Sequence, residues 1–307
     1  MDYQKLKNIA KVSRATLAHI AMIMYVLGVL FALAVGVPFD LYRFLLGYLV
    51  VFTSVYATGA TNNYFDAPLD KNATQTAFSG GSDILSKHPE LRPTMRRIII
   101  FLYSTSIVLG FVFTVVFSFP ASFFAFILVS NFIGCSYTAP PLRLVYRGLG
   151  EVLTMFGIGF SVVGAGYWVM KGTIDLTFVL FSLPLLLLAF AVNFYLEIPD
   201  RYADTLGHKN TIVVLRGERF GFIVGAVSLA LATLCYILFS IYSVFSGTAS
   251  YVPLAVFSLL PLIIGIWALR EYLVDKAKMM QVVFRATAGI VLAWILMDVY
   301  LVYVILT

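Results

Sequence analysis

The sequence predicts an all-α polytopic membrane protein, with nine transmembrane helices in a single domain over residues 1–307. Three observations favour this class. Of the 307 residues, 61% are hydrophobic and only 12% are charged, whereas a soluble domain is about half apolar and about a quarter charged. Nine apolar segments have the length of about 20 residues that a helix needs to cross a bilayer. Lysine and arginine concentrate in alternate loops, which is typical of a polytopic topology.

The nine expected spans follow one another with short connections on one side of the membrane. The third and fourth spans form a tight helical hairpin at Phe119 and Pro120, and proline suits the first turn of a helix. Cys135 and Cys235 lie inside apolar spans, so we interpret them as buried apolar side chains and not as a disulfide or metal site. The spans are expected at residues 15–36, 41–61, 97–118, 120–138, 151–170, 175–197, 220–245, 252–270 and 284–306.

The positive charges indicate which face is cytoplasmic. With nine spans, all 21 lysine and arginine residues except Arg43 and Lys171 fall on one face, which the positive-inside rule makes cytoplasmic. The N-terminus then lies in the cytoplasm and the C-terminus outside. Loops on the cytoplasmic face are long and polar, so we expect an integral cell membrane protein whose active-site face is cytoplasmic. The net charge of +6 follows from this topology, although it also favours an anionic ligand.

A first cluster of polar residues, NNYFDAPLD, follows the second span. Asn62, Asp66 and Asp70 recur every four residues, which places them on one face of a helix. Pro68 would clash with the carbonyl group four residues earlier, so we expect the helix to end or bend there. Loop polarity at a helix end is the alternative interpretation. Carboxylates at a helix C-terminus oppose the macrodipole unless a cation offsets them, which favours a metal site.

A second cluster follows the sixth span, in the segment NFYLEIPDRYADTLGHKN. Asp200 and Asp204 have the same four-residue spacing, with Glu197 one turn earlier and Lys209 just beyond. Mg²⁺ prefers oxygen ligands and commonly uses one or two carboxylates together with phosphate oxygens. Two acidic clusters on different helices, both beside basic loops, therefore predict a magnesium-bridged diphosphate, in which the metal neutralises the leaving group.

These motifs and the nine spans resemble the UbiA superfamily of intramembrane prenyltransferases. NNYFDAPLD is similar to the NDxxDxxxD motif of that family, with Asn63 in place of the first aspartate, and Asp200 and Asp204 match its DxxxD motif. Gly207 comes one residue sooner than the usual glycine, and Glu197 stands where many members have asparagine. The resemblance implies that nine helices enclose a central chamber with a polar cap on the cytoplasmic side. It implies Mg²⁺ held by Asn62, Asp66, Asp70, Asp200 and Asp204, with Asp66 and Asp200 catalytic and Glu197 a possible additional ligand.

Three further segments resemble the 1,4-dihydroxy-2-naphthoate prenyltransferase branch of menaquinone synthesis, namely FSGGSDIL (78–85), YTAPPLRLVYRGLGEVL (137–153) and GHKNTIVVLRG (207–217). The expected reaction is therefore transfer of a long isoprenoid chain from a prenyl diphosphate, such as geranylgeranyl diphosphate, to a dihydroxynaphthoate-like aromatic. A geranylgeranylglyceryl phosphate acceptor is the alternative, since archaeal ether-lipid enzymes share the core motifs. The expected partners are these two substrates and membrane lipids, and no nucleic acid.

Cations in the cytoplasmic loops are the expected partners of the diphosphate. Lys209, Arg143 and Arg147 lie in motif-bearing loops, and Arg14 opens the first span. The positive-inside rule by itself explains them equally well. Tyr137 could hydrogen-bond the diphosphate, although tyrosine is common at membrane interfaces.

A membrane transporter is the rival class, because charges inside a membrane also mark transport pathways. Asp298 lies within the last span, and structure and function explain it equally well. Against transport, the acidic residues concentrate at one face instead of the bilayer midplane, and no pair of broken helices occupies corresponding positions.

Overall fold

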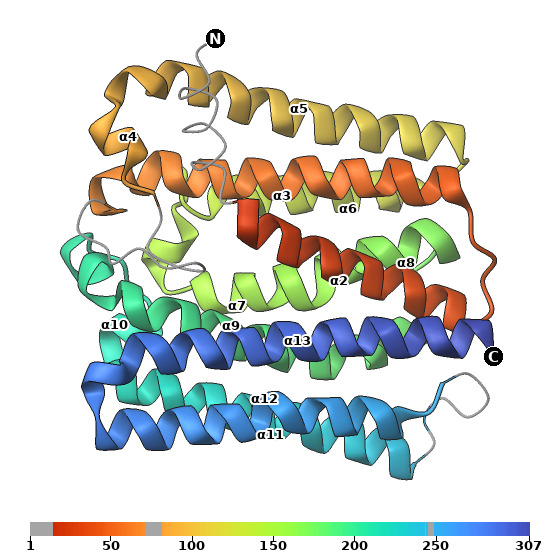
Figure 1. Ribbon diagram of the computed structural model, residues 1–307. Helices are drawn as coiled ribbons and strands as arrows, with labels where there is room; N and C mark the ends of the chain where they lie inside the picture. The colour runs from red at the N-terminus through yellow and green to blue at the C-terminus, as the bar shows by residue number, and fades with distance from the viewer. Residues whose placement is uncertain (1–14, 71–81, 243, 245–248) are drawn as a thin grey trace.

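The computed structural model describes residues 15–70, 82–242, 244 and 249–307, and the side chains of residues 15–18 and 70 lie outside this description. Within the described ranges all regular structure is helical (Figure 1). The elements are α2 (Ala15–Ala34), α3 (Leu41–Asp70), α4 (Ile84–Lys87), η1 (Pro89–Leu91), α5 (Arg92–Val116), α6 (Ala121–Ser136), η2 (Leu144–Arg147), α7 (Gly150–Phe156), the π-helical segment η3 (Gly157–Val162), α8 (Val163–Lys171), α9 (Leu176–Leu206), α10 (Ile212–Arg216), α11 (Glu218–Ile241), α12 (Tyr251–Val274), η4 (Lys276–Lys278) and α13 (Met279–Leu306).

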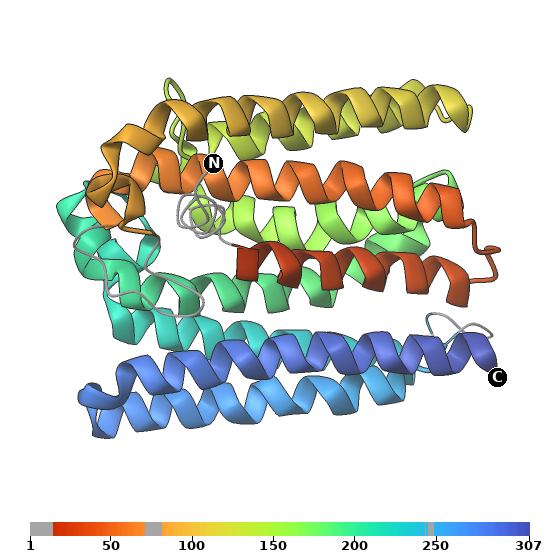
Figure 2. The same ribbon diagram turned by 45° about the horizontal axis from the view of Figure 1, so that its top comes forward.

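The long helices run side by side, and both ribbon views show the short helices α4 and α10 at one end of the bundle and the C-terminus at the other (Figures 1 and 2). Helix α3 packs against α5, α2 packs against α8, and α11 packs against both α9 and α12. Helix α13 contacts α12, α2 and α9, and so connects the N-terminal helix α2 with the C-terminal helix α12. We call the end that contains α4, η2 and α10 the polar end, because the acidic motifs at the ends of α3 and α9 lie there.

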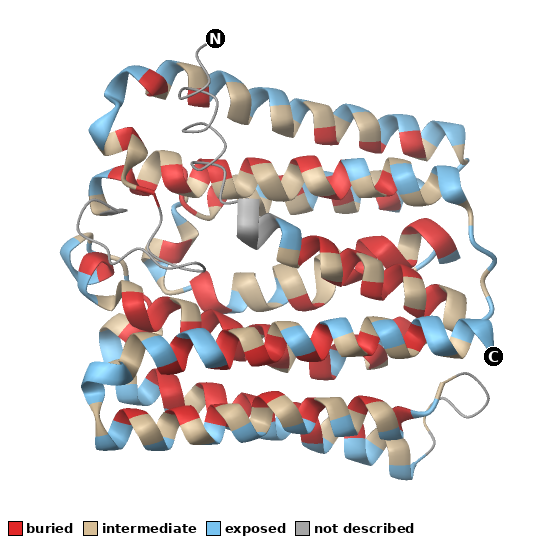
Figure 3. Cartoon of the chain, viewed as in Figure 1, coloured by how far each residue is buried: buried red, intermediate tan, exposed pale blue. Residues whose placement is uncertain are grey.

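The outer surface of the bundle is apolar. Seven described helices are long and apolar enough to cross a membrane, and two shorter apolar helices span His19–Ala34 and Ala121–Ser136. In the most apolar stretch of α9, 56% of the residues are buried, against 22% in the helix that begins at Pro89 and includes α5. Helix α9 therefore lies in the core, whereas α5 has exposed apolar residues such as Phe101 and Phe111. Figure 3 shows exposed and intermediate residues along most of α5. An apolar outer face is what a lipid environment requires, so the all-α membrane class is confirmed.

Helices α2 and α8 pack unusually closely, with two glycines at their contact. A Cβ atom on Gly28 would lie 1.9 Å from the backbone oxygen of Val163, and one on Gly166 would lie 2.1 Å from that of Tyr25. Small residues allow helix backbones to approach in this way within a membrane. We call this contact the α2–α8 seam.

Helix α3 continues through Pro68 to Asp70, so the prediction that the helix ends at this proline is wrong, and a bend there stays a prediction. The proline ring cannot supply the backbone hydrogen bond to the carbonyl group of Tyr64, four residues earlier. That carbonyl instead accepts a hydrogen bond from Arg92 Nη2 at 3.3 Å. The guanidinium group of Arg92 also lies 4.6 Å from the centre of the Tyr64 ring. A cation from the start of α5 thus stabilises the helix where proline leaves a carbonyl without its usual donor.

Candidate functional site

The first acidic motif lies on the last three turns of α3, at the polar end. Asp66 is 6% exposed, and its Oδ1 accepts a hydrogen bond from the hydroxyl group of Tyr146 at 2.7 Å. One turn earlier, Asn62 Oδ1 accepts a hydrogen bond from Thr138 Oγ1 at 3.0 Å. Both donors come from the 137–150 loop, which follows α6. This loop therefore packs directly over the motif and orients two of its side-chain oxygen atoms.

The second acidic motif lies on the last turns of α9, which continues through Pro199 to Leu206. Asp204 is 6% exposed, and Asp200, one turn earlier, is partly buried. Glu197 is also buried, and its Oε1 accepts a hydrogen bond from Asn193 Nδ2 at 2.8 Å. Glycine allows the ends of α9 and α3 to meet, because a Cβ on Gly207 would lie 2.4 Å from the Leu69 side chain.

Lys209 joins the two motifs. Its Nζ lies 2.9 Å from Asp66 Oδ2 and 3.0 Å from Asp204 Oδ1, and its side chain is 12% exposed. Its backbone N–H also donates to the carbonyl oxygen of Asp204 at 3.0 Å. Burial by itself would lower the pKa of Lys209, but the charges of Asp66 and Asp204 outweigh it and raise the pKa well above its usual value. One lysine cation thus neutralises carboxylates from both motifs, which we call the Asp66–Lys209–Asp204 cluster.

The 137–150 loop brings further predicted residues to the same end. The guanidinium group of Arg143 lies 3.8 Å from the centre of the Tyr146 ring, and Arg147 is exposed and donates to the carbonyl oxygen of Pro141 at 3.2 Å. The hydroxyl group of Tyr137 accepts a hydrogen bond from Thr154 at 3.3 Å. Burial raises the pKa of Tyr137, and the charge of Glu197 raises it further, so its phenol stays protonated at neutral pH.

Three residues of this arrangement were not predicted from the sequence: Tyr146, Thr138 and Glu151. Burial, followed by the charge of Asp66, raises the pKa of Tyr146 to about 12, so it stays a hydrogen-bond donor. Glu151 is fully buried and accepts a hydrogen bond from the backbone N–H of Ile212, in the first turn of α10. The segment YRGLGEVL contains Tyr146 and Glu151, but nothing in its spacing shows which distant segment it contacts.

Two predicted residues stay untested by these contacts. Arg14 and the side chain of Asp70 lie outside the described residues. Among the described side chains, no three His, Cys, Asp or Glu residues gather closely enough to hold a metal ion. The donors nevertheless suit Mg²⁺, because Asp66 and Asp204 supply hard oxygen atoms to one shared cation. The lysine ammonium group is the cation that stands between them in this structure.

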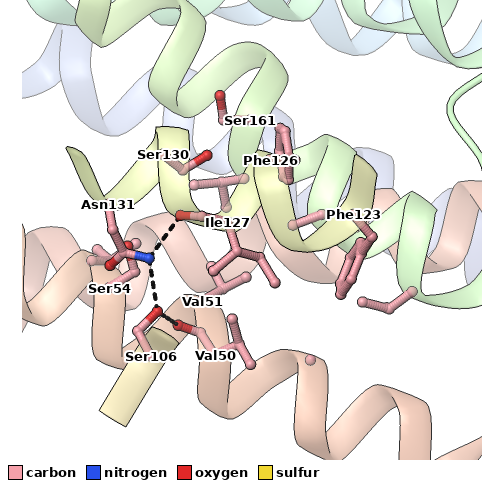
Figure 4. Close-up of a pocket in the computed structure, with 15 residues that line it drawn as sticks. Val50, Val51, Ser54, Ser106, Phe123, Phe126, Ile127, Ser130, Asn131 and Ser161 are labelled. Atoms are coloured by element: carbon pink, nitrogen blue, oxygen red, sulfur yellow. Dashed lines mark hydrogen bonds between the residues drawn. The ribbon is translucent and has the colours of Figure 1, made fainter. Parts of the chain in front are cut away.

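A cavity of about 60 Å³ lies deeper in the bundle, between α3, α5, α6 and the η3–α8 segment (Figure 4). Its walls are mostly apolar, with Asn131 among the polar exceptions. Asn131 Nδ2 donates to Ser106 Oγ at 3.1 Å and to the carbonyl oxygen of Ile127 at 2.8 Å. Ser54, which lines the cavity, lies twelve residues before Asp66, so the helical rise separates them by about 18 Å along α3. The π-helical segment contributes Ser161, and π-helices are frequent at functional sites.

Comparison with known proteins gives three findings. A family model described as the UbiA prenyltransferase family matches residues 21–288. The chain is 26% identical over 177 residues to a 1,4-dihydroxy-2-naphthoate octaprenyltransferase of Bacillus subtilis (strain 168), which covers 58% of this chain and 54% of that protein. The match thus spans about half the length of this curated relative.

The third finding concerns solved structures. The fold is similar to that of a digeranylgeranylglyceryl phosphate synthase, with a TM-score of 0.67, 17% identity, and coverage of 98% of this chain and 99% of that chain. It is also similar to a UbiA homologue from Archaeoglobus fulgidus bound to GPP and Mg²⁺, with a TM-score of 0.66, 13% identity, and coverage of 98% and 100%. At these identities the similarity shows a shared fold.

Proposed function

Because the chain belongs to the UbiA prenyltransferase family, we propose that it transfers a long isoprenoid chain from a prenyl diphosphate to a dihydroxynaphthoate-like aromatic within the membrane. The observation that carries the proposal is the Asp66–Lys209–Asp204 cluster. There, two acidic motifs separated by more than a hundred residues meet at one cation at the polar end. Charges arranged in this way suit a diphosphate that leaves together with divalent cations.

The residues that would hold Mg²⁺ are those of the two motifs: Asn62, Asp66, Asp70, Asp200 and Asp204. When bound, Mg²⁺ neutralises the negative charge of the diphosphate leaving group. A structural neighbour bound to GPP and Mg²⁺ supports this assignment. The chain itself supplies the remaining cations, since Lys209, Arg143 and Arg147, with Arg14 and the phenol of Tyr137, would bind the phosphate oxygens.

The isoprenoid chain would extend from the polar end toward the cavity beside Ser54. The apolar walls of the cavity suit a hydrocarbon, because burial of each CH₂ group contributes about 0.8 kcal/mol to binding. We assign the polar end to the cytoplasm and the C-terminus to the outside on the basis of the charged loops. In this arrangement α2 and α6 complete the nine spans of one domain, and the substrate enters laterally from the bilayer.

The similarity to the naphthoate octaprenyltransferase favours an aromatic acceptor. The experiment that tests this offers purified protein geranylgeranyl diphosphate and Mg²⁺ with three acceptors in parallel: the dihydroxynaphthoate, 4-hydroxybenzoate and geranylgeranylglyceryl phosphate. Products are identified by mass spectrometry, and diphosphate release is followed separately. We expect a prenylated naphthoate. If only the glyceryl phosphate is prenylated, the acceptor is a glyceryl phosphate and not a naphthoate. If no diphosphate is released with any acceptor, the transporter interpretation is favoured.

Variants of the acidic motifs test the metal assignment. Asp66→Ala and Asp200→Ala should abolish turnover, and EDTA should do the same to the unaltered protein. Elution of each variant as a single folded species in detergent serves as the control for structure. Activity that persists in either variant, or in EDTA, would contradict the assignment.

A further inference from the structure

Tyr146 contacts the first acidic motif through its hydroxyl group. The phenol donates to Asp66 Oδ1 at 2.7 Å, while Lys209 holds Oδ2 of the same carboxylate at 2.9 Å. Each oxygen of Asp66 therefore has its own partner, and the two contacts together fix the plane of the carboxylate. Partners of this kind orient metal ligands, and their loss commonly lowers metal affinity by about 10- to 100-fold.

The ring of Tyr146 contacts cations of the polar end. Arg143 lies over the ring at 3.8 Å from its centre, and Lys209 Nζ lies 5.7 Å from it. Arg143 adopts a left-handed backbone conformation, with φ of 46°, which is uncommon for a residue other than glycine and marks functional loops. An aromatic face attracts an exposed cation by electrostatics. The ring thus holds an otherwise exposed arginine beside the Asp66–Lys209–Asp204 cluster.

The backbone of Tyr146 connects the two loops of the polar end. Its carbonyl oxygen accepts a hydrogen bond from Asn210 Nδ2 at 2.9 Å, next to Lys209 in sequence. Within its own loop, the N–H of Val145 donates to the carbonyl oxygen of Tyr137 at 3.0 Å, and Val145 is buried. The backbone at Tyr146 is therefore held by contacts that do not depend on its hydroxyl group. Substitution of the side chain alone can separate the two roles.

We propose that Tyr146 is a positioning residue with two separable roles: its hydroxyl group orients Asp66 toward the metal, and its ring holds Arg143 toward the diphosphate. This proposal rests on the proposed function, since it assumes a metal and a diphosphate at the polar end. Neither contact requires Tyr146 to touch the reacting atoms. The hydroxyl role concerns Mg²⁺ affinity, and the ring role concerns diphosphate affinity.

The experiment compares Tyr146→Phe, which keeps the ring, with Tyr146→Leu, which removes it. Binding of Mg²⁺ is measured by calorimetry on protein without substrate, and binding of inorganic pyrophosphate is measured at saturating Mg²⁺. Tyr146→Phe should weaken Mg²⁺ binding at least about tenfold and weaken pyrophosphate binding at saturating metal less than Tyr146→Leu does. Tyr146→Leu should weaken both, with a further loss of about two- to fivefold for pyrophosphate, the range of an exposed cation–π contact.

Tyr167→Phe is the matched control. The hydroxyl group of Tyr167 also donates to an aspartate, Asp175, at 3.0 Å, but outside the polar end. We expect this variant to bind Mg²⁺ and pyrophosphate as the unaltered protein does. Equal Mg²⁺ binding by Tyr146→Phe and the unaltered protein would overturn the hydroxyl role, and equal losses in both Tyr146 variants would overturn the ring role. Because binding is measured without an acceptor, a failed acceptor assay would contradict the proposed function and leave these results interpretable.

Discussion

Lys209→Met removes the cation of the Asp66–Lys209–Asp204 cluster while keeping an unbranched side chain of similar length. The two carboxylate oxygens each lie within 3.0 Å of the lysine nitrogen, so they are at most about 6 Å apart. At an effective dielectric constant of about 20, two negative charges at about 6 Å repel each other by about 3 kcal/mol. Removing one partner of a buried ion pair costs about 3–5 kcal/mol in measured cases. We therefore expect metal-free Lys209→Met to lose about 3–5 kcal/mol of stability.

Mg²⁺ should restore much of this loss, since it would occupy the space between the same carboxylates. A ligand at about 100 times its dissociation constant stabilises the folded state by about 2.7 kcal/mol. The assay is thermal unfolding of detergent-purified protein in EDTA and in a series of Mg²⁺ concentrations. In EDTA the variant should unfold at a lower temperature than the unaltered protein. Its unfolding temperature should rise more with Mg²⁺ than that of the unaltered protein.

Lys278→Met provides the matched control. Lys278 also bridges two carboxylates, those of Glu271 at 2.5 Å and Asp275 at 3.9 Å, but its side chain is 49% exposed. Exposed ion pairs contribute little to stability, so this variant should unfold close to the unaltered protein at every Mg²⁺ concentration. The reasoning is refuted if Lys209→Met is as stable as Lys278→Met in EDTA, or if Mg²⁺ stabilises both variants equally.

Three further predictions concern the cavity, the α2–α8 seam and the end of α3. Ser54→Phe should fill the cavity and shift the preferred donor to a shorter prenyl diphosphate, as measured by competition between donors. Val108→Phe, on the exposed face of α5, is the control and should leave the preference unchanged. An unchanged preference in both variants would show that the isoprenoid chain does not occupy the cavity. Gly28→Val should lower the thermal unfolding temperature, because overpacking costs about 1–3 kcal/mol or more, while Gly157→Val is the control, since no atom lies within 4 Å of an added Cβ there. Arg92→Met should cost about 1–3 kcal/mol and speed hydrogen exchange in the last turns of α3, and unchanged exchange there would mean that the helix continues through its proline without this arginine.

The membrane helices could be predicted from the sequence because the bilayer requires long apolar segments. The first span was expected at 15–36, and α2 covers Ala15–Ala34. The extent of the second and sixth helices could not be predicted in this way, since α3 and α9 continue to Asp70 and Leu206, well beyond their apolar stretches. Hydropathy reports only where lipid contact ends, whereas a helix continues as long as its backbone groups find partners, as the Tyr64 carbonyl does with Arg92.

The candidate site was predictable to the extent that local spacing determines it. The four-residue spacing placed Asp66 and Asp204 at helix ends, and loop position identified Lys209 as a cation near them. The contact of Lys209 with both aspartates could not be read from spacing, and neither could the hydrogen bond between Tyr146 and Asp66, whose residues lie 80 positions apart. Such contacts depend on how loops fold over the helix ends, which no helical periodicity records.

The α2–α8 seam has a consequence for how a lipid reaches the interior. Where Gly28 meets Val163 and Gly166 meets Tyr25, even a single added methyl group would overlap backbone atoms. A hydrocarbon chain is wider than that, so this part of the protein wall is sealed against the surrounding lipid. Under the lateral entry proposed above, a membrane-dissolved substrate would pass between other helices, so the α2–α8 seam forms a closed side of the bundle.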